Sequence, residues 1–575
     1  MKVVLAKRAG FCMGVRRAIE MVMVEANKKE GPLFTFGPLI HNRQVLDLLA
    51  AKGVKVADDL NGLKEGRILI RAHGIPPQER HALEETGLKV IDATCPKVTK
   101  VQAIIRHHTN KGYSAVIVGD SEHAEVIGLM GYSKTPAHVI QEARDVSTLP
   151  VLDKVFVVAQ TTQNKQNYND VVRALKKKFP DVLVFDTICE ATQERQEEVR
   201  TFRGLVDAVV VVGGYHSGNT QRLAQISEEE GLPTFHVETD KDLDRDRLSA
   251  MEVIGLTAGA STPHWMIQQV LTEIVGIRGR REPLVATWVR RAFKFLVLSN
   301  LTVAAGAFSF SYAASLLSGR DPNLVFPFLA ALYIYAMHVF NRFLDKDASA
   351  YSHPERAVFL RRYRLVLIMA GGTSLAIALV LAYIIGHATL LVLIGLSLLG
   401  IIYSLPLIPK GLRPRYRYSK IKDLPGSRSL SEALAWVAVI SLLPILDQVR
   451  AVSPAVVIAA LVVFSFSYAK AISFSIFQVQ GDLMVGAETL PITLGEEKTL
   501  MILRFILATT AIILIGGPIL GMVEPFSFLM LLPLFTLSFC LWAYEKRWLY
   551  PGIPLEALIE SNFLISGLLA VIWQS

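Results

Sequence analysis

The sequence predicts a two-part protein, with a soluble α/β half followed by an all-helical membrane half. At 575 residues the chain exceeds what one hydrophobic core usually organises. Before about residue 285 the apolar runs are short and interrupted by charge and glycine, which is typical of a soluble α/β protein. After that point, long apolar stretches recur to the end of the sequence. We therefore expect domains at 1–282 and 294–575, joined by a linker at 283–293.

The apolar stretches of the second half are long enough to cross a hydrocarbon core of roughly 30 Å as helices. Lysine and arginine gather in alternate loops between them, and short basic loops stay on the cytoplasmic side. The sequence thus predicts an integral protein of the cytoplasmic membrane whose first half lies in the cytoplasm. About nine transmembrane helices are expected, over 294–316, 324–341, 365–386, 389–407, 431–447, 453–477, 501–523, 526–544 and 556–573.

The formal net charge of +9 does not require a nucleic acid partner. Much of the excess lysine and arginine belongs to the loops beside the predicted membrane helices. Membrane lipid headgroups are the expected partners of such loops. The start of the sequence, MKVVLAKRAGFC, is too polar for a signal peptide, which agrees with a cytoplasmic first half.

Three cysteines occupy the same place in three repeats of the first half. Cys12, Cys95 and Cys189 each follow a short strand-like run and precede a helical pattern. Disulfides are disfavoured in a cytosolic protein. A cysteine that opens a helix gains from the helix dipole, which favours the thiolate that a metal needs. The fourth cysteine, Cys540, lies in a predicted membrane helix and is expected to pack as a small apolar side chain.

Polar residues recur at two further predicted strand ends in each repeat. Carboxyl ends of parallel strands gather ligand groups, so a threefold arrangement would bring these residues around one pocket with the cysteines. One strand end carries His41, His123 with Glu125, and Ser217 with Asn219, and the other carries His73, Thr161 and Ser261.

The chemistry of this set favours an iron-sulfur site. Three thiolates suit a 4Fe-4S cluster, which has four irons, so one iron would be open to a substrate oxygen. Imidazoles, hydroxyls and an amide could hold an anionic group such as diphosphate, and Glu125 could supply a proton to a departing hydroxyl. Structural zinc is the rival interpretation, but zinc ligands usually cluster at short spacing and these cysteines are more than eighty residues apart. The residues predict a reductive dehydroxylation without naming its substrate.

The motifs of the first half resemble the LytB/IspH family, the 4-hydroxy-3-methylbut-2-enyl diphosphate reductases, over about residues 1–280. The resemblance implies a cloverleaf of three α/β lobes with a pseudo-threefold repeat. It also implies a 4Fe-4S cluster on Cys12, Cys95 and Cys189, and isopentenyl and dimethylallyl diphosphate as products of the non-mevalonate pathway. The motifs are GFCMGV, HN at 41–42, AHG at 72–74, DATCPKVTKV, HAE at 123–125, QTT at 160–162, DTIC, SGNT and TAGAS.

The same resemblance implies roles for the polar residues. Glu125 would act in the proton relay, with His123 and Thr161 near the substrate hydroxyl, and a ferredoxin or flavodoxin-type protein would donate electrons. Two departures occur: Ala124 replaces the usual proline, and Gly218 replaces the second serine of the family's SSN motif, although its backbone N–H could still contribute. The implied diphosphate ligands are His41, His73, Ser217, Asn219 and Ser261.

The second half resembles the UbiA superfamily of prenyltransferases, on its nine predicted helices and on two loops, FNRFLDKDASAYSHPERA and FQVQGDLMVGAETLPITLG. The resemblance implies two aspartate-rich motifs that hold magnesium against a prenyl diphosphate. The first motif keeps Asn341 and Asp345, but Ser349 stands at its last position and Asp347 is displaced. The second motif keeps only its last aspartate, because it reads Ser475, Gln478 and Asp482.

This loss leaves alternatives for the membrane half, because magnesium ions on a diphosphate need anionic ligands. The half is either an active prenyltransferase on a lipid-soluble acceptor or a non-catalytic anchor that binds prenyl lipids. Its remaining carboxylates could instead cap helices or pair with Arg342 and Arg356. For the first half, an electron carrier or a vestigial head on a lipid-binding protein are the alternatives, and the complete polar set disfavours both. A possible magnesium site would comprise Asn341, Asp345, Asp347 and Asp482.

Overall fold

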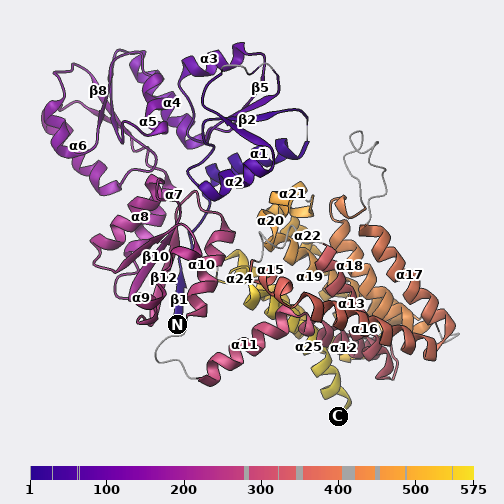
Figure 1. Cartoon of the computed structure of the whole chain (residues 1–575). Helices are drawn as coiled ribbons and strands as arrows, with labels where there is room; N and C mark the ends of the chain where they lie inside the picture. The colour runs from indigo at the N-terminus through magenta and orange to yellow at the C-terminus, as the bar shows by residue number, and fades with distance from the viewer. Residues whose placement is uncertain are drawn as a thin grey trace. The chain divides into compact units, whose positions relative to one another are not determined.

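The chain divides into two compact units, Met1–Glu282 and Pro283–Ser575, here called the α/β unit and the helical unit. Figure 1 shows the computed structural model, in which the first unit runs from indigo to magenta and the second from magenta to yellow. The structure describes residues 2–575 except 29, 61–62, 64, 278–283, 322, 345–353, 405–420, 447–452, 486–487 and 547.

The α/β unit contains three four-stranded sheets in which every pair of neighbouring strands is parallel. The first has the order β3-β2-β4-β5, with β2 at Leu33–Phe36, β3 at Val54–Ala57, β4 at Arg67–Ile70 and β5 at Lys89–Asp92. The second has the order β7-β6-β8-β9, with β6 at Ser114–Val118, β7 at Ala137–Ile140, β8 at Val155–Ala159 and β9 at Leu183–Val184. The third has the order β1-β12-β10-β11, with β1 at Lys2–Leu5, β10 at Ala208–Val212, β11 at Thr234–Val237 and β12 at Val253–Ala258.

The three sheets share one topology. Each places the strands of its repeat in the order second, first, third, fourth. The fourth strand of the last sheet is β1, which comes from the start of the chain and pairs with β12, Lys2 facing Val253. Each cysteine therefore follows the edge strand of a different sheet, namely β1, β5 or β9.

Central strands of the sheets are buried on both faces, which explains their continuous apolar sequences. All five residues of β10, AVVVV, are buried, and Val210 packs into one hydrophobic cluster while Val211 packs into another. The same alternation occurs in β6, where Val116 and Ile117 face different clusters. Helices thus cover both faces of these sheets.

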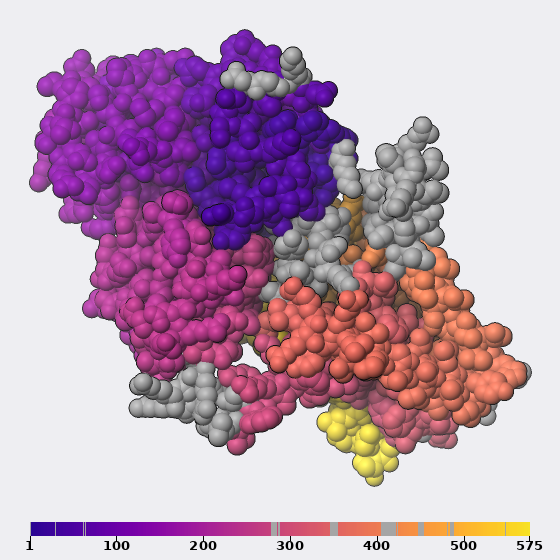
Figure 2. Space-filling view, in the orientation of Figure 1, coloured from indigo at the N-terminus to yellow at the C-terminus, as the bar shows by residue number. Residues whose placement is uncertain are grey.

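A helix follows the first, third and fourth strand of each repeat. The parts of the chain built around the first, second and third sheets are here called the first, second and third lobes. In the space-filling view they form an indigo, a purple and a magenta block, apart from β1 of the third sheet, which has the indigo of the N-terminus (Figure 2). The helices after the first strands are α2 at Arg43–Ala51, α5 at Ala124–Gly131 and α8 at Gly218–Glu229. Those after the third strands are α3 at Pro77–Glu85, α6 at Lys165–Lys178 and α10 at His264–Gly276. Those after the fourth strands are α4 at Pro96–Thr109, α7 at Glu190–Arg200 and α1 at Met13–Lys28, and the short α9 spans Arg245–Ser249.

The helical unit packs its helices around one hydrophobic core. Its first helices are α11 at Leu284–Leu298, α12 at Leu301–Leu317, α13 at Val325–Leu344, α15 at Pro354–Arg362, α16 at Arg364–Ile385 and α17 at His387–Ser404. They are followed by α18 at Ser427–Val437, extended by tighter and wider turns to Ile445, then α19 at Pro454–Phe477, α20 at Val479–Val485 and α21 at Leu490–Leu494. The last are α22 at Glu496–Ile519, α23 at Phe526–Leu529, α24 at Leu531–Glu545 and α25 at Ile553–Gln574.

Among the described residues, six helical segments are long and apolar enough to cross a membrane, and the bent pair α11–α12 would make a seventh. The six are α16, α18 with its extension, α19, α22, α23 with α24, and α25. The spans expected over 324–341 and 389–407 fall on α13 and α17, neither of which is among the six. The count of nine stays a prediction.

The sequence predicted one continuous helix over 294–316, and this prediction is wrong, because the helix is broken in the structure. The segment from Trp288 to Leu298 and α12 meet at 69°. At the break Asn300 has φ 63°, a left-handed conformation that asparagine tolerates better than most residues. Its Oδ1 accepts a hydrogen bond of 3.0 Å from Nε of Arg342. The helix α11 begins at Leu284, inside the segment expected as the linker.

Candidate functional site

The three cysteines each stand where a helix begins. Cys95 and Cys189 are the N-cap residues of α4 and α7, and Cys12 directly precedes α1. All three are free and half-buried. The sequence forms this arrangement because an extended residue after an edge strand leads straight into a helical pattern. The carbonyl of each cysteine accepts the first helical N–H, from Arg16 at 2.9 Å, Thr99 at 3.0 Å and Gln193 at 3.0 Å.

Backbone hydrogen bonds attach each cysteine to the end of the third strand of its own sheet. The N–H of Cys95 donates to the carbonyl of Ala72 at 2.9 Å, directly before His73. The N–H of Cys12 donates to the carbonyl of Ala260 at 3.1 Å, directly before Ser261. In the second lobe, Cys189 donates to Thr161 at 2.9 Å. Each thiol thus lies beside one of the predicted polar strand ends.

The thiols of the three lobes lie close to one another. Burial raises the pKa of the Cys95 thiol, and the nearby Cys12 and Cys189 raise it further, because thiolates repel one another. Gly14 explains how the first helix approaches so closely, since a Cβ at this position would lie 2.5 Å from Sγ of Cys95. Three neighbouring thiols that repel as thiolates fit a shared cationic group.

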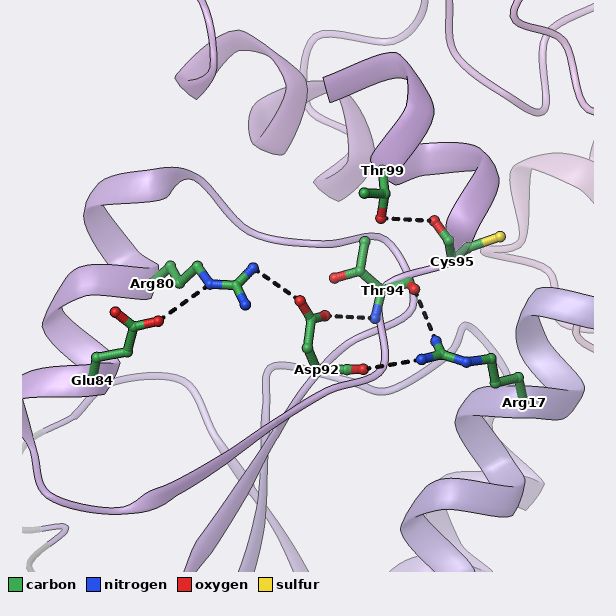
Figure 3. Close-up of polar contacts among 7 residues, drawn as sticks. All are labelled: Arg17, Arg80, Glu84, Asp92, Thr94, Cys95 and Thr99. Atoms are coloured by element: carbon green, nitrogen blue, oxygen red, sulfur yellow. Dashed lines mark hydrogen bonds and ion pairs between the residues drawn. The ribbon is translucent and has the colours of Figure 1, made fainter. Parts of the chain in front are cut away.

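A polar network fixes the loop before Cys95 (Figure 3). Asp92 accepts from the N–H of Thr94 at 2.9 Å and from Nη1 of Arg80 at 2.9 Å. Burial would raise the pKa of Asp92, but these hydrogen bonds outweigh it and lower the pKa. From α1, Arg17 donates to the carbonyl of Thr94 at 3.0 Å, which ties the Cys12 helix to the Cys95 loop.

Arg195, on α7, is a site residue that sequence reasoning missed. Its side chain is 5% exposed, and it donates to the carbonyl of Gly10 at 2.7 Å and to that of Ala191 at 2.6 Å. Burial lowers its pKa, while the neighbouring Cys12 and Cys189 thiols raise it. A buried cation thus faces two of the three thiols. The only sequence signal was a basic residue one to two turns after a cysteine.

Three histidines from two lobes form a cluster. The ring centroids of His41 and His73 are 4.7 Å apart, and His123 lies 5.5 Å and 5.4 Å from them. One ring nitrogen of each lies within 4.8 Å of the others, a spacing that could hold a metal ion or an anion. The first strands of the first and second lobes supply His41 and His123, and the third strand of the first lobe supplies His73.

The imidazoles are held in their neutral form. Burial lowers the pKa of His41 and of His73, and lowers that of His123 to about 4, and Arg71 adds to the effect in each case. Within the described part of the chain, Nε2 of His41 and Nδ1 of His73 are buried without a hydrogen-bond partner. Buried polar atoms without partners are costly, and imidazole nitrogens can donate to an anion, so these atoms fit an anionic ligand.

The third lobe adds hydroxyls and an amide to the histidines. Oγ of Ser261 donates to the carbonyl of His41 at 3.2 Å and to Oγ of Ser217 at 3.3 Å. Asn219 is 5% exposed, and neither its amide nitrogen nor its amide oxygen has a partner among the described residues. Gly218 begins α8, and a Cβ there would meet nothing within 4 Å. This lobe therefore contributes, beside His41, an amide group whose hydrogen-bonding atoms have no partner among the described residues.

Glu125 is the buried acid of the site. It is 2% exposed, and Thr161 holds both of its oxygens, by its N–H at 2.7 Å and by its hydroxyl at 2.9 Å. Burial raises the pKa of Glu125, against the lowering effect of the Thr161 hydrogen bonds. The backbone N–H of Glu125 donates to Nδ1 of His123 at 3.1 Å. A carboxyl with a raised pKa can carry a proton near neutral pH.

The observed strand ends change one correspondence between the repeats. His73 and Ser261 each lie three residues after the end of the third strand, at Ile70 and Ala258. In the second lobe this strand ends at Ala159, so the matching residue is Thr162. Thr161 instead matches the alanines whose carbonyls bind the other cysteines. The register expected at this strand was one residue off.

A cavity of about 730 Å³ lies between the second and third lobes. Its wall includes His123 and Gly218 of the candidate site, together with Asn164 and Arg222. Nη2 of Arg222 donates to Oε1 of Gln163 across the two lobes at 3.4 Å. The cavity thus connects the polar cluster to the surface between these lobes.

In the helical unit, the structure describes part of the expected magnesium set. Asn341 is exposed on α13, whereas Asp345 and Asp347 lie outside the described residues. Asp482 is 2% exposed, and its Oδ1 lies 3.7 Å from Nη1 of Arg428. Ser475, which stands at an aspartate position of the second motif, hydrogen-bonds Oγ of Ser429 at 3.4 Å. The described aspartate therefore already faces a cation.

Comparisons with known proteins match each half of the chain separately. Residues 3–275 match the family described as LytB protein, and residues 299–552 match the UbiA prenyltransferase family. The 4-hydroxy-3-methylbut-2-enyl diphosphate reductase of Geobacter sulfurreducens is 44% identical over 274 residues, which cover 48% of this chain and 97% of that protein.

Solved structures are similar to either half. A reductase structure from Plasmodium falciparum is 32% identical, covers 47% of this chain and 87% of that one, and has a TM-score of 0.46. A UbiA homologue from Aeropyrum pernix is 16% identical, covers 47% and 98% of the two chains, and has a TM-score of 0.37. From the two family matches and the sequence relative, the chain belongs to the LytB family of 4-hydroxy-3-methylbut-2-enyl diphosphate reductases through its first half, which is fused to a UbiA prenyltransferase family domain.

Proposed function

We propose that the α/β unit converts 4-hydroxy-3-methylbut-2-enyl diphosphate into isopentenyl and dimethylallyl diphosphate by reductive dehydroxylation. The observation that carries the proposal is the set of buried polar atoms without partners beside three neighbouring thiols. His41 and His73 offer ring nitrogens, and Asn219 offers both amide atoms. The substrate is that of the reductases to which the α/β unit is similar.

The reaction consumes two electrons and two protons. The allylic C–O bond breaks, one proton leaves with the hydroxyl as water, and the other adds to the carbon skeleton. Addition at one or the other end of the allylic system gives the two products. The electrons come one at a time from a ferredoxin or flavodoxin-type donor.

Cys12, Cys95 and Cys189 are the proposed ligands of a 4Fe-4S cluster. When bound, the cluster supplies electrons and a Lewis-acidic iron that no cysteine occupies. The chain's own part is to bring three thiols to one place from three lobes and to offset their charge with Arg195.

The polar cluster would bind the diphosphate. His41, His73, Ser217, Asn219 and Ser261 offer donors at the ends of strands from two lobes, and the N–H of Gly218 opens α8 toward the same place. The imidazoles are neutral before binding. A bound anion would favour their protonated form, and the resulting imidazolium would attract the diphosphate.

Glu125 is the proposed source of the proton that leaves with the hydroxyl. Thr161 fixes both carboxyl oxygens and so orients the acid, and His123 lies directly before it at the start of α5. Burial, which raises the pKa of Glu125, keeps the acid protonated at a higher pH than an exposed glutamate. These three residues would surround the departing hydroxyl.

For the whole chain we propose a reductase tethered to the cytoplasmic membrane. The three lobes form a cloverleaf in the cytoplasm, a linker at 283–293 follows, and nine helices span the bilayer. Support comes from the basic loops between the apolar stretches and from the six described helices that are long enough to cross. The membrane half either transfers a prenyl group or binds prenyl lipids without chemistry.

Anaerobic purification of the full chain tests the reductase proposal. We expect about four irons per chain, a brown chromophore, and turnover of the hydroxylated diphosphate with a chemical electron donor. Replacing Cys95 by serine should remove both the chromophore and the turnover. A preparation that holds four irons but does not turn the substrate over contradicts the proposal, as does turnover without iron.

A further inference from the structure

The helical unit contains an interior cluster of charged side chains, four of them buried and two partly buried, that the reductase does not use. It comprises three basic and three acidic residues from five helices, together with the imidazole of His338. Buried charges inside a membrane bundle are costly, and they usually mark a site of function. The members, here called the interior charge cluster, are Arg342, Arg356, Lys470, Glu432, Glu556 and Glu560.

The members lie within direct or electrostatic reach of one another. Nη2 of Arg356 is 2.6 Å from Oε2 of Glu556, with both side chains at most 2% exposed. Nζ of Lys470 is 3.0 Å from Oε1 of Glu432. The imidazole of His338 is 3.6 Å from the same carboxyl and within electrostatic reach of Arg342 and Arg356. The cluster is thus one connected site.

The chain does not fill the hydrogen-bonding capacity of this site by itself. Arg356 is only 1% exposed. Among the described residues, its Nε and Nη1 have no hydrogen-bond acceptor. Arg342 donates a hydrogen bond to a neutral partner, the side-chain oxygen of Asn300. A buried guanidinium with two empty donors loses the full desolvation cost of those groups unless an acceptor arrives.

This cluster adjoins the positions where magnesium ligands are expected. Arg342 directly follows Asn341 on α13, and Lys470 lies on α19 before Ser475. On α18, Arg428 and Ser429 contact Asp482 and Ser475 and lie one turn before Glu432. The cluster and the second motif are therefore neighbours along two helices.

The described residues do not fit magnesium. The carboxylates of Glu432, Glu556 and Asp482 each face Lys470, Arg356 or Arg428. A divalent cation at any of them would meet a fixed positive charge. Magnesium binds through carboxylates, phosphates and water, and three of the expected carboxylate positions are Ser349, Ser475 and Gln478.

We propose that the helical unit binds the phosphate or diphosphate headgroup of an isoprenoid lipid without magnesium, through the fixed cations of the interior charge cluster. Arginine presents a planar fork of donors that matches phosphate oxygens, and the empty N–H groups of Arg356 are such donors. Nζ of Lys470 lies 4.6 Å from the ring centroid of Trp436 and 5.8 Å from that of Phe563. These rings offer an apolar wall for the first isoprene unit.

The test is a titration of the full-length protein in lipid nanodiscs with geranyl S-thiolodiphosphate, which resists loss of its diphosphate. Binding should be unchanged by EDTA and should not tighten when magnesium is added. It should weaken at least tenfold, about 1.4 kcal/mol, in Arg342→Gln and in Arg356→Lys, because each loses donors to the headgroup. The matched control is Arg361→Gln, an exposed arginine on the same helix as Arg356.

Reductase turnover in the same preparations separates this inference from the function proposed for the α/β unit. Turnover should persist in all three variants, so weaker binding then belongs to the helical unit. A requirement for magnesium overturns the inference, as does binding by Arg342→Gln and Arg356→Lys that equals the control. Inorganic diphosphate that binds as tightly as the geranyl compound overturns the assignment to a lipid. If Arg342→Gln unfolds on heating earlier than the control, Arg356→Lys decides, because lysine can keep the pair with Glu556.

Discussion

At the scale of single residues, the chemistry of the reductase site depends on groups whose protonation the fold controls. Burial lowers the pKa of His41 and His73, and that of His123 to about 4, so the three imidazoles are neutral near pH 7 before an anion binds. Burial raises the pKa of Glu125 at the same time. The ligand-free site is therefore less charged than its composition indicates.

Binding of dimethylallyl diphosphate should take up protons at pH 7, on the order of one per site, because the anion raises the pKa of the imidazoles. Calorimetric titrations in buffers of different ionisation enthalpy measure the uptake. His107→Asn, which changes an exposed histidine outside the cluster, should leave it unchanged. Binding enthalpies that do not depend on the buffer would contradict the prediction.

The lowered pKa of His123 also predicts how the stability of the fold depends on pH. An unfolded histidine takes up its proton near pH 6.5, whereas buried His123 resists protonation down to about pH 4. The ligand-free protein should therefore lose stability as the pH falls through this window.

Replacing Glu125 by glutamine should lower turnover about 100-fold or more, because a proton donor is lost while the shape is kept. The KM should change little, since the carboxyl contacts Thr161 rather than the diphosphate ligands. Steady-state kinetics of Glu125→Gln and of the surface control Glu122→Gln measure the difference. Equal kcat values in the two variants would rule out Glu125 as the acid.

Replacing Arg195 by glutamine should make the proposed cluster harder to reduce and easier to lose. The substitution removes a buried positive charge beside Cys12 and Cys189 and the hydrogen bond to Gly10. Potentiometric titration and iron analysis measure the two effects, and Arg203→Gln, an exposed arginine of the same lobe, is the control. An unchanged midpoint potential would assign Arg195 a purely structural role.

At the scale of elements, two glycines have opposite surroundings: one lies against a neighbouring side chain and the other borders open space. A Cβ at Gly14 would lie 2.5 Å from Sγ of Cys95, whereas one at Gly218 would meet nothing within 4 Å. Gly14→Ala should therefore push α1 from the Cys95 loop and cost about 1–3 kcal/mol. Gly218→Ser should fold normally and add one hydroxyl to the proposed diphosphate site.

Iron content and thermal unfolding of the two variants test this contrast. Gly14→Ala should lose iron and unfold at a lower temperature, while Gly218→Ser should match the parent in both and bind the diphosphate at least as tightly. Full iron content in Gly14→Ala would show that α1 can shift without cost.

The cysteine repeat was predictable from sequence because each unit is local: a strand, a cysteine and a helix within a short stretch of chain. Positions set by packing between elements were not predictable. Arg195 has the sequence pattern of a solvated helix face, and only the packing of α7 against the Gly10 loop buries it. The match of Thr162 rather than Thr161 to His73 required the observed strand ends, because a run such as VAQTT does not show where pairing stops.

In the helical unit the apolar stretches predicted helices, but they did not predict the break at Asn300. An asparagine within an apolar run was the available signal. Its left-handed backbone and its hydrogen bond from Arg342 of another helix were visible only in the structure. The interior charge cluster was likewise partly visible in the sequence, which offers Arg342 and Arg356 as partners of the remaining carboxylates. Their burial and their empty donors required the structure.

At the scale of the whole molecule, the two-part organisation followed from composition alone, whereas the parallel sheets and their shared topology required the structure. The match to relatives ends where the α/β unit ends, and it covers 97% of the Geobacter sulfurreducens reductase. We therefore expect residues 1–282 expressed alone to fold, hold iron and turn over the hydroxylated diphosphate with a kcat similar to that of the full chain. Anaerobic assays of the two forms measure this, and an insoluble or inactive fragment would show that the helical unit is needed for the fold.

The place of β1 at the edge of the third sheet has a consequence for synthesis on the ribosome. Lys2–Leu5 can pair only after Val253–Ala258 has emerged, and the N–H of Cys12 finds its acceptor only at Ala260. Until then the segment with the first cysteine lacks its partners in the third sheet, while the first and second lobes can already form. The first apolar helices of the second half follow within a few dozen residues. The third lobe can therefore be completed only a short interval of translation before those apolar helices emerge.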